Sequence, residues 1–236
     1  PGHQDFSEDT YRTLMAADCA VMVIDAAKGV EAQTIKLFKV CTLRHIPIFT
    51  FVNKMDREAR DPFELMENIE EILGIKTYPM NWPISCGKDF KGVYDRSAKR
   101  VLAFSSDGRA NGVKMVDEIE AELGDAALDA LIGTANHEKL AEDIELLDGA
   151  AEEFDLEAVQ HGELSPVFFG SALTNFGVEP FLKEFLRLTP TPLPRKDAAS
   201  GELVDPCSEQ FSGFVFKIQA NMNKNHRDRI AFLRIC

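Results

Sequence analysis

The sequence has little that suits a membrane protein, a disulfide framework or a zinc site. No apolar run approaches the roughly 18 residues that a transmembrane helix needs, and no secretory signal pattern is present. The five cysteines lie far apart, are odd in number and form no C-x-x-C pair. This spacing favours free thiols in a reducing cytosol over disulfides or bound zinc. We therefore expect a cytoplasmic protein that makes no use of a membrane.

Positive charge is also scarce. The chain has 26 Lys and Arg against 39 Asp and Glu, a formal net charge of -13. This balance disfavours binding of the chain as a whole to naked nucleic acid, specific DNA included, or to anionic lipid. A local basic cluster remains at 221–229, where Lys224, His226, Arg227 and Arg229 accompany one Asp. The cluster fits contact with RNA phosphates and a solvated hairpin equally well.

Both ends of the sequence interrupt a pattern. PGHQDF at 1–6 begins on a Pro-Gly pair, a turn signal, with no initiator Met. At the other end, the strand pattern of 229–235 runs into Cys236 with no closing turn. These features lead us to expect an internal piece of a longer protein.

Apolar runs alternate with helical patterns in the first part of the chain. The runs 19–24 and 46–52 are typical of strands buried on both faces of a parallel sheet. Helical patterns cover 7–16 and 31–43, and a third helix begins at Asp61-Pro62, where Asp suits the cap and Pro the first turn. Strand, helix, strand, helix predicts a doubly wound α/β sheet.

The pattern changes in the middle of the chain and then returns. Short strands around glycine turns are predicted at 82–94, and acidic helices at 112–162. A strand at 166–169 and a helix at 178–188 resume the α/β pattern, which predicts an α+β insertion at about 77–164. The acidic helices suit either a protein-docking face or, as charge runs usually do, a solvated surface. We favour the solvated surface.

The last part of the chain is predicted to be a separate unit. A Pro-rich segment at 189–194 stiffens the end of the first domain, so we assign 1–194 to the α/β domain and 195–209 to a linker. Alternating apolar residues at 211–218 indicate a half-buried strand that 229–235 can pair with. Residues 210–236 are thus expected to begin a β-barrel domain.

Asn53-Lys54-Met55-Asp56 is the most informative segment, because it directly follows an apolar strand. Ligands of open α/β sheets bind beyond the carboxyl ends of the strands. A carboxylate there can accept hydrogen bonds from the N1 and N2 donors of guanine, whereas adenine has no matching donors. Asn53 can bond the purine edge or a neighbouring loop, and the Lys54 stem can lie along the base. The alternative is a polar loop without a ligand, which the strand context disfavours.

Gly170-Ser171-Ala172 repeats this design after the strand 166–169. Small residues let backbone N–H groups approach a ligand closely, and the Ala172 N–H could donate to O6 of guanine. The tripeptide alone is commonplace after a strand. Its position after Asp56 and before the last helix of the domain favours a second contact with the base.

Pro1-Gly2-His3 suits a terminal phosphate. The Gly2 N–H can bond the phosphate, and His3 can orient a water for in-line attack, since both ring nitrogens form hydrogen bonds. Phosphoryl transfer needs mainly positioning and charge stabilisation from a protein. A histidine on a surface turn would look the same, so this interpretation depends on the two loops downstream.

The three segments, in this order, resemble the translational GTPase family. Pro1-Gly2-His3 is similar to the end of that family's third conserved stretch, Asn53 to Asp56 to its fourth, and Ser171-Ala172 to its fifth. The insertion resembles that of elongation factor G. FSGFVFKIQANM and HRDRIAF resemble the members that act in translation termination, and the resemblance covers nearly the whole chain.

The resemblance implies a P-loop GTPase that works on the ribosome with GTP or GDP and Mg²⁺. Its hydrolysis of GTP would promote dissociation of the decoding (class I) release factors after peptide release. His3 is the implied catalytic residue. The implied nucleotide-binding residues are Pro1, Gly2, His3, Asn53, Lys54, Met55, Asp56, Ser171 and Ala172.

The phosphate-binding motif G-x-x-x-x-G-K-[ST] does not occur in the sequence. The backbone cradle for phosphates and the hydroxyl that binds Mg²⁺ are therefore not among these residues. We expect no metal ligand in this chain and place the Mg²⁺ ligands in an N-terminal part not included in it. The chain alone is expected to bind nucleotide poorly and to hydrolyse none.

Two alternatives stay open. One is another ribosomal GTPase, such as an elongation factor G-like or ribosome-protection protein, against which Gln4 and the HRDRIAF segment argue. The other is a non-catalytic docking module that keeps the GTPase fold. An intact phosphate-binding loop upstream of Pro1 would favour the enzyme, and its absence the module.

Overall fold

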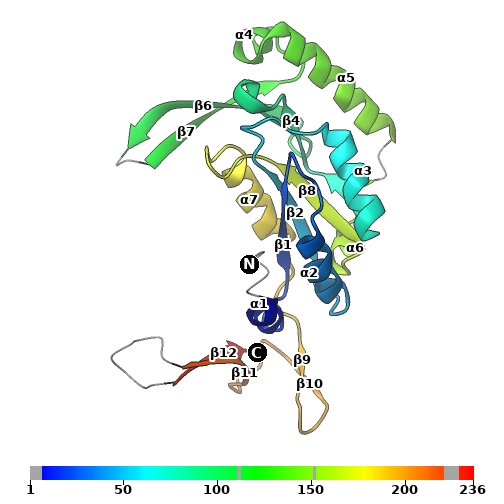
Figure 1. Cartoon of the computed structure of the whole chain (residues 1–236), viewed down its shortest axis with the longest axis vertical. Helices are drawn as coiled ribbons and strands as arrows, with labels where there is room; N and C mark the ends of the chain where they lie inside the picture. The colour runs from blue at the N-terminus through cyan, green and yellow to red at the C-terminus, as the bar shows by residue number, and fades with distance from the viewer. Residues whose placement is uncertain (1–6, 111–112, 151–152, 221–228) are drawn as a thin grey trace.

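The computed structural model describes residues 7–110, 113–150, 153–220 and 229–236. Figure 1 shows a central sheet with its helices, an insertion above it and small sheets below it. Among the described residues, no helix combines the length and the apolar character needed to cross a bilayer. All five cysteines are unpaired.

Four parallel strands form the central sheet, in the order β1-β2-β8-β3. Their bounds are β1 Ala20–Asp25, β2 Ile48–Asn53, β8 Leu164–Phe169 and β3 Lys76–Pro79. All of β8, and all of β2 except its last residue, is buried. Parallel strands are buried in this way when helices cover both faces of the sheet. The predicted doubly wound α/β fold is confirmed.

Helices cover the sheet on both sides (Figure 1). They are α2 Ala32–Thr42, α3 Pro62–Leu73 and α7 Val178–Leu188, whereas α1 Ser7–Leu14 lies at the lower end of the sheet in Figure 1. Successive side chains of β2 point to opposite faces, so Phe49 and Phe51 pack with Phe181 of α7 in one core cluster. Val52 packs in the other cluster with Leu65 of α3.

Helix α3 starts and stops where the sequence indicates. The Asp61 carboxylate accepts a hydrogen bond from the Phe63 N–H at 2.9 Å, which satisfies a free donor of the first turn. Pro62 is the first helical residue, and Gly74 ends the helix with a left-handed φ of 69°.

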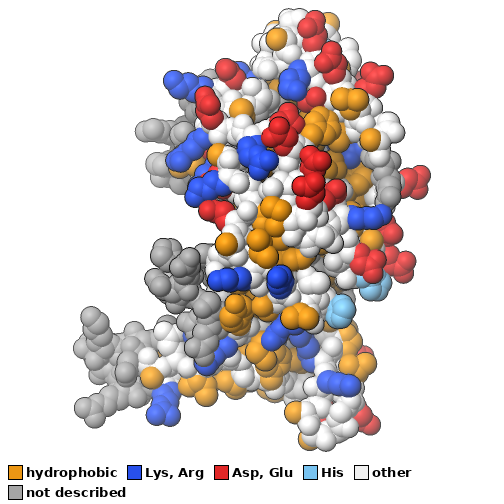
Figure 2. Space-filling view, turned by 45° about the vertical axis from the view of Figure 1, so that its right-hand side comes forward, with side chains coloured by type: hydrophobic (Ala, Val, Ile, Leu, Met, Phe, Trp, Pro, Cys, Tyr) orange, Lys and Arg blue, Asp and Glu red, His pale blue; other side chains and the backbone are white. Residues whose placement is uncertain are grey.

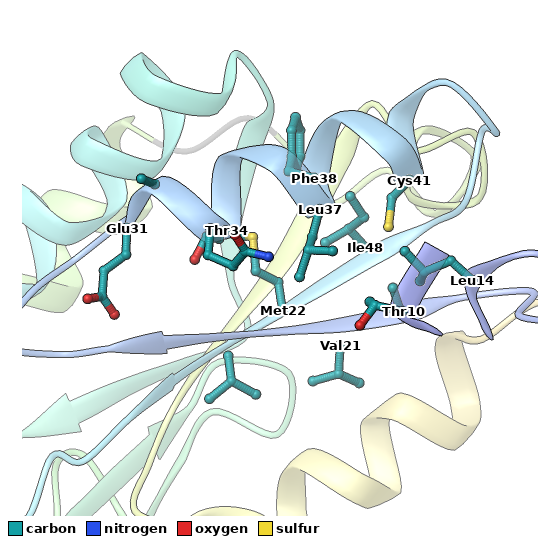
Figure 3. A pocket seen from close by; sticks show the side chains of 14 residues that line it. Thr10, Leu14, Val21, Met22, Glu31, Thr34, Leu37, Phe38, Cys41 and Ile48 are labelled. Atoms are coloured by element: carbon teal, nitrogen blue, oxygen red, sulfur yellow. The ribbon is translucent and has the colours of Figure 1, made fainter. Parts of the chain in front are cut away.

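Strand β1 corrects one prediction, because only one of its faces is covered. Val21 and Val23 are 41% and 57% exposed, whereas Ile24 is buried. The strand lies at the end of the sheet order and has a neighbouring strand on one side only. A groove of about 550 Å³ runs along this edge, and Figure 3 shows Met22 and Leu37 among its mainly apolar lining.

The insertion occupies residues 80–163, between β3 and β8. Its antiparallel sheet has the order β4-β5-β6-β7. The strands are β4 Asn81–Ile84, β5 Gly92–Asp95, β6 Arg100–Ala110 and β7 Val113–Glu122, with a short 3-10 turn η2 Gly87–Asp89. Helices α4 Leu128–Ile132, α5 Thr134–Ala150 and α6 Leu156–Gln160 follow. Because β3 pairs with β8, residues 77–79 belong to the main sheet, and the antiparallel sheet begins slightly after the expected boundary.

Strand β7 corrects the prediction that all of 112–162 is helical. Its backbone pairs with β6 over nearly its whole length. Near the end of β7, the small Ala121 is buried whereas the larger apolar Ile119 is exposed. The apolar residues of this strand therefore do not mark its buried side chains. Pairing with a distant strand overrides the helical preference of this acidic segment.

Acidic side chains gather over the insertion in Figure 2, whereas hydrophobic ones gather over the small sheets below. These sheets pair β9 Arg195–Lys196 with β10 Leu203–Val204, and β11 Gly213–Ala220 with β12 Arg229–Ile235. The expected linker thus contains a short hairpin. That β11 and β12 begin a barrel stays a prediction.

Asp18 ties the small sheets to the main domain. It follows α1, and its carboxylate accepts hydrogen bonds from Arg195 and from Arg234. Arg195 also donates to the Ala17 carbonyl and Arg234 to the Ala16 carbonyl. The two guanidinium groups thus bind both the Asp18 carboxylate and the backbone carbonyls that follow α1. The C-terminal end of a helix carries partial negative charge, which favours cations at this position.

His137 at the start of α5 is expected to make the insertion pH-sensitive. Its Nδ1 lies 2.8 Å from Asp129 Oδ1 and its Nε2 lies 2.7 Å from the Leu123 carbonyl oxygen. Only the doubly protonated ring can donate hydrogen bonds to both acceptors. The bond to Asp129, and to a lesser extent the bond to Leu123, raises the pKa of His137 above 6.5. The protonated His137 ring therefore stabilises the folded insertion. This contribution to the free energy of unfolding is complete below about pH 6.5 and is lost as the pH rises through the raised pKa of His137.

Thermal unfolding followed by circular dichroism from about pH 6 to pH 9 checks this pH dependence. We expect the difference in melting temperature between the parent chain and His137→Gln to shrink as the pH rises. A difference that stays constant over this range would contradict the assignment.

Candidate nucleotide-binding site

The two loops that the sequence singles out meet at one edge of the central sheet. Strands β2 and β8 are neighbours in parallel register, with Val52 opposite Phe169, so their following loops start side by side. The Ala172 N–H donates to Asn53 Oδ1 at 2.9 Å, and the Ser171 hydroxyl donates to Asp56 Oδ1 at 2.6 Å. The Met55 N–H also donates to the Gly170 carbonyl at 3.2 Å, so three hydrogen bonds join one loop to the other.

One carboxylate oxygen of Asp56 is open to a ligand. Ser171, whose side chain is fully buried, occupies its Oδ1. No donor from the described residues bonds Asp56 Oδ2, and the side chain is only partly buried. A carboxylate oriented by one hydrogen bond and open at its second oxygen can accept a hydrogen bond from a guanine donor.

Lys54 is held in an unusual backbone conformation. Its φ is +73°, in the left-handed region that side chains other than glycine rarely adopt. Asn53 Oδ1 accepts a hydrogen bond from the Lys54 N–H at 2.8 Å and so stabilises this turn. The Lys54 ammonium lies 2.7 Å from Asp25 Oδ2, an ion pair that fixes the direction of the long side chain.

Asp25 is a site residue that our sequence reasoning missed. It is the last residue of β1 and lies opposite Asn53 in the sheet. Its Oδ1 accepts a hydrogen bond from the Ala27 N–H, and the hydrogen bond from Lys54 is the main reason that the pKa of Asp25 is lowered. An acidic residue that ends a strand next to the Asn53 strand is the signal that could have found it.

The structure shows the surroundings of two residues predicted to contact the nucleotide, Met55 and Ala172. The Met55 side chain is 1% exposed and packs in the core, so it supports the loop from below, and its contact with the nucleotide stays a prediction. The Ala172 N–H, expected to donate to guanine O6, donates to Asn53 Oδ1 in this structure, and the contact with O6 stays a prediction. Sequence reasoning could not foresee this bond, because it joins residues 119 positions apart.

The turn after β8 requires glycine at its first position. A Cβ on Gly170 would lie 2.6 Å from the Phe176 carbonyl oxygen and 2.8 Å from Phe51 Cζ. Contacts this short do not occur with a real side chain, so the close approach of Ser171 to Asp56 depends on Gly170.

The predicted phosphate contacts Pro1, Gly2 and His3 lie outside the described residues. Within the described part of the chain, no group of three or more His, Cys, Asp or Glu side chains could hold a metal ion.

Comparison with known proteins identifies the family. The sequence profile of the elongation factor Tu GTP-binding domain matches residues 1–191. The chain belongs to this family. The predicted membership of the translational GTPases is confirmed.

Similar proteins extend the match to the whole chain. Peptide chain release factor 3 of Symbiobacterium thermophilum is 60% identical over 235 residues, and that of Gloeobacter violaceus is 54% identical over 236 residues. Each alignment covers 100% of this chain but 44% of the relative. The chain therefore spans a little under half the length of these proteins.

A solved structure supports the fold. The crystal structure of a protein from Thermus thermophilus covers 100% of this chain with a TM-score of 0.66, and the chain covers 34% of that protein. At 24% sequence identity, this likeness concerns the fold alone.

Proposed function

We propose that this chain supplies the guanine-recognition site of a GTPase that acts in translation termination. The observation that carries the proposal is the junction of the two loops, in which Ser171 orients Asp56 and leaves Asp56 Oδ2 open. The similarity to proteins named peptide chain release factor 3 supports termination as the process.

Base selection in this proposal comes from Asp56. Its carboxylate accepts hydrogen bonds from N1–H and the 2-amino group of guanine. Adenine would leave the carboxylate without donors, and a polar group that loses water without gaining a partner makes binding unfavourable. The ion pair with Asp25 aligns the Lys54 stem beside the base and ribose.

Hydrolysis depends on residues at the start of the chain. Bound GTP supplies the γ-phosphate that is transferred to water. Gly2 donates its N–H to that phosphate, and His3 orients the attacking water. The Mg²⁺ ligands are proposed to belong to a part of the protein outside this chain. Because the phosphate-binding motif G-x-x-x-x-G-K-[ST] is not in this sequence, the chain alone is proposed to bind nucleotide weakly and to lack turnover.

The full-length protein that contains this chain is proposed to act in the cytoplasm on the ribosome. There, GTP binding and hydrolysis promote dissociation of the decoding release factors after the peptide is freed. An elongation factor G-like protein would act on translocation instead, and a docking module would act without nucleotide. Two measurements, of release-factor dissociation and of translocation, separate these three activities.

The assay follows a fluorescent class I release factor on ribosomes that have already released their peptide. We expect the full-length protein with GTP to speed dissociation about tenfold or more, and ATP to have no effect. Faster translocation without faster dissociation would identify an elongation factor G-like protein. Equal dissociation with and without nucleotide would identify a docking module.

A further inference from the structure

We propose that the insertion positions the guanine site, because it holds both base-recognition loops in place. The proposal rests on the proposed guanine-binding function. Its positioning residues are Gly87, Asn81 and Phe104, none of which touches the base. Three separate contacts between the insertion and the two loops support this role.

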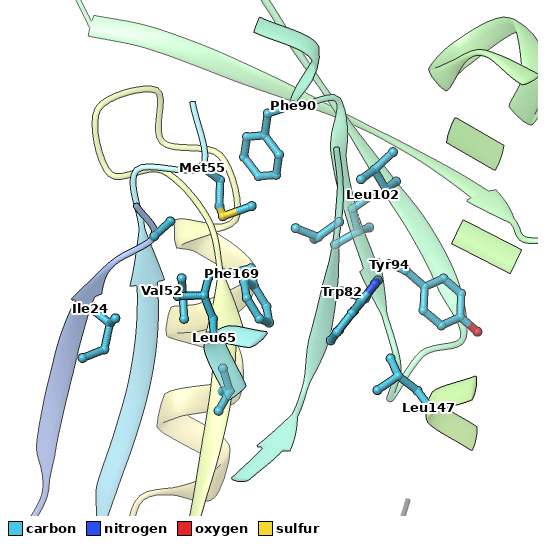
Figure 4. Close-up of a cluster of buried hydrophobic side chains, with 14 of the residues drawn as sticks. Ile24, Val52, Met55, Leu65, Trp82, Phe90, Tyr94, Leu102, Leu147 and Phe169 are labelled. Carbon is cyan, nitrogen blue, oxygen red and sulfur yellow. The ribbon is translucent and has the colours of Figure 1, made fainter. Parts of the chain in front are cut away.

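The first contact is made by Gly87, the first residue of the turn η2 that follows β4. Its N–H lies 2.8 Å from the Met55 carbonyl oxygen and 3.0 Å from the Arg57 carbonyl oxygen. The insertion therefore bonds the Asn53–Asp56 loop through its backbone, on both sides of Asp56. Figure 4 shows the Met55 side chain directed toward Phe90, so packing reinforces this contact.

The second contact is made by Asn81 in β4. Its Oδ1 accepts a hydrogen bond from the Phe169 N–H at 2.7 Å, and its amide donates to the Phe169 carbonyl at 3.2 Å. Asn81 is 4% exposed, so Phe169 could not exchange these bonds for water without opening the core. The insertion thus fixes the last residue of β8, immediately before Gly170.

The third contact closes the Ser171 loop. The Ser171 N–H donates to the Phe176 carbonyl at 2.8 Å. This hydrogen bond joins the two ends of the 171–176 loop. The Phe176 ring packs against Phe104 of β6, with ring centres 5.0 Å apart, and against Phe90 at 6.0 Å. Aromatic side chains of the insertion therefore support the loop that orients Asp56.

Backbone strain is concentrated at these contacts. Among the described residues, five that are not glycine have a positive φ, and three of them are Lys54, Ser85 and Asn175. Lys54 lies in the first base-recognition loop, and Asn175 lies beside Phe176 in the second. Ser85 lies two residues before Gly87. The loop that contains Lys54 and the segment that contains Ser85 are joined by the hydrogen bonds of Gly87, so these rare conformations lie next to the contact between the insertion and the first loop.

The test compares GDP with IDP, which lacks the 2-amino group of guanine. Wild-type full-length protein should prefer GDP, because Asp56 accepts a hydrogen bond from that group. Phe104→Leu and, separately, Phe176→Leu should reduce the GDP-to-IDP affinity ratio about fivefold or more, the usual size of coupling between sites. Both substitutions keep an apolar side chain in the core.

The matched control is Leu140→Ala, a core substitution in α5 of the same insertion. It should lower the melting temperature but leave the GDP-to-IDP ratio unchanged, since a loss of stability alone does not alter base selection. An unchanged ratio in both phenylalanine variants, or an equal reduction in Leu140→Ala, would overturn the positioning role.

Hydrogen exchange on the 236-residue chain separates this inference from the proposed function. In Phe104→Leu, amides of 53–57 and 170–176 should exchange faster than in Leu140→Ala, without any nucleotide. Unchanged exchange there would overturn the inference. Faster exchange, combined with no GDP preference in the wild-type full-length protein, would support the positioning role and contradict guanine binding.

Discussion

Asp56→Asn in the full-length protein is expected to lose GTP affinity on the order of 10³-fold and to gain affinity for XTP. The aspartate can accept both guanine donors, whereas an asparagine amide presents one acceptor and one donor. In xanthine a carbonyl replaces the 2-amino group of guanine, so the same position of the base becomes an acceptor. Equilibrium titration with fluorescent GTP and XTP analogues measures the change.

Ser171 determines which way the new amide points. Its hydroxyl donates to Asp56 Oδ1, so the asparagine oxygen is expected to keep that place. The amide nitrogen then takes the place of Oδ2 and faces the xanthine carbonyl. Asp61→Asn is the control, because asparagine caps a helix as well as aspartate does and Asp61 caps α3. Retained preference for GTP in Asp56→Asn would contradict the assignment of base selection to this residue.

The position of the site could be predicted because it depends on local sequence and one general property of sheets. Each loop directly follows an apolar run, and the carboxyl ends of adjacent parallel strands lie together. The same reasoning predicted the capped start of α3 at Asp61. Two polar segments far apart in sequence were thereby placed at one edge of the sheet.

The sequence did not reveal features that depend on distant partners. Residues 19–24 have the composition of a strand buried on both faces, yet β1 lies at the end of the sheet and exposes Val21 and Val23. Strand β7 looks helical by composition, but it pairs with β6. Asn81 and Phe176 are ordinary residues in the sequence, and only the folded chain brings them to Phe169 and Phe104.

His3→Ala in the full-length protein is expected to leave GTP binding within about twofold and to slow ribosome-stimulated hydrolysis about 100-fold or more. The prediction rests on sequence, since His3 lies outside the described residues. A residue that orients the attacking water contributes to the transition state and little to the bound ground state, so kcat falls while affinity is kept.

Single-turnover hydrolysis with saturating ribosomes measures the chemical step, and a separate GTP titration measures binding. The matched control is His137→Gln, which changes a histidine of the insertion that contacts Asp129 and Leu123 and lies in neither base-recognition loop. It should hydrolyse GTP at the parent rate under conditions in which both proteins are folded. Near-normal turnover in His3→Ala would remove His3 from the catalytic step, and a parallel loss of GTP affinity would reassign it to binding.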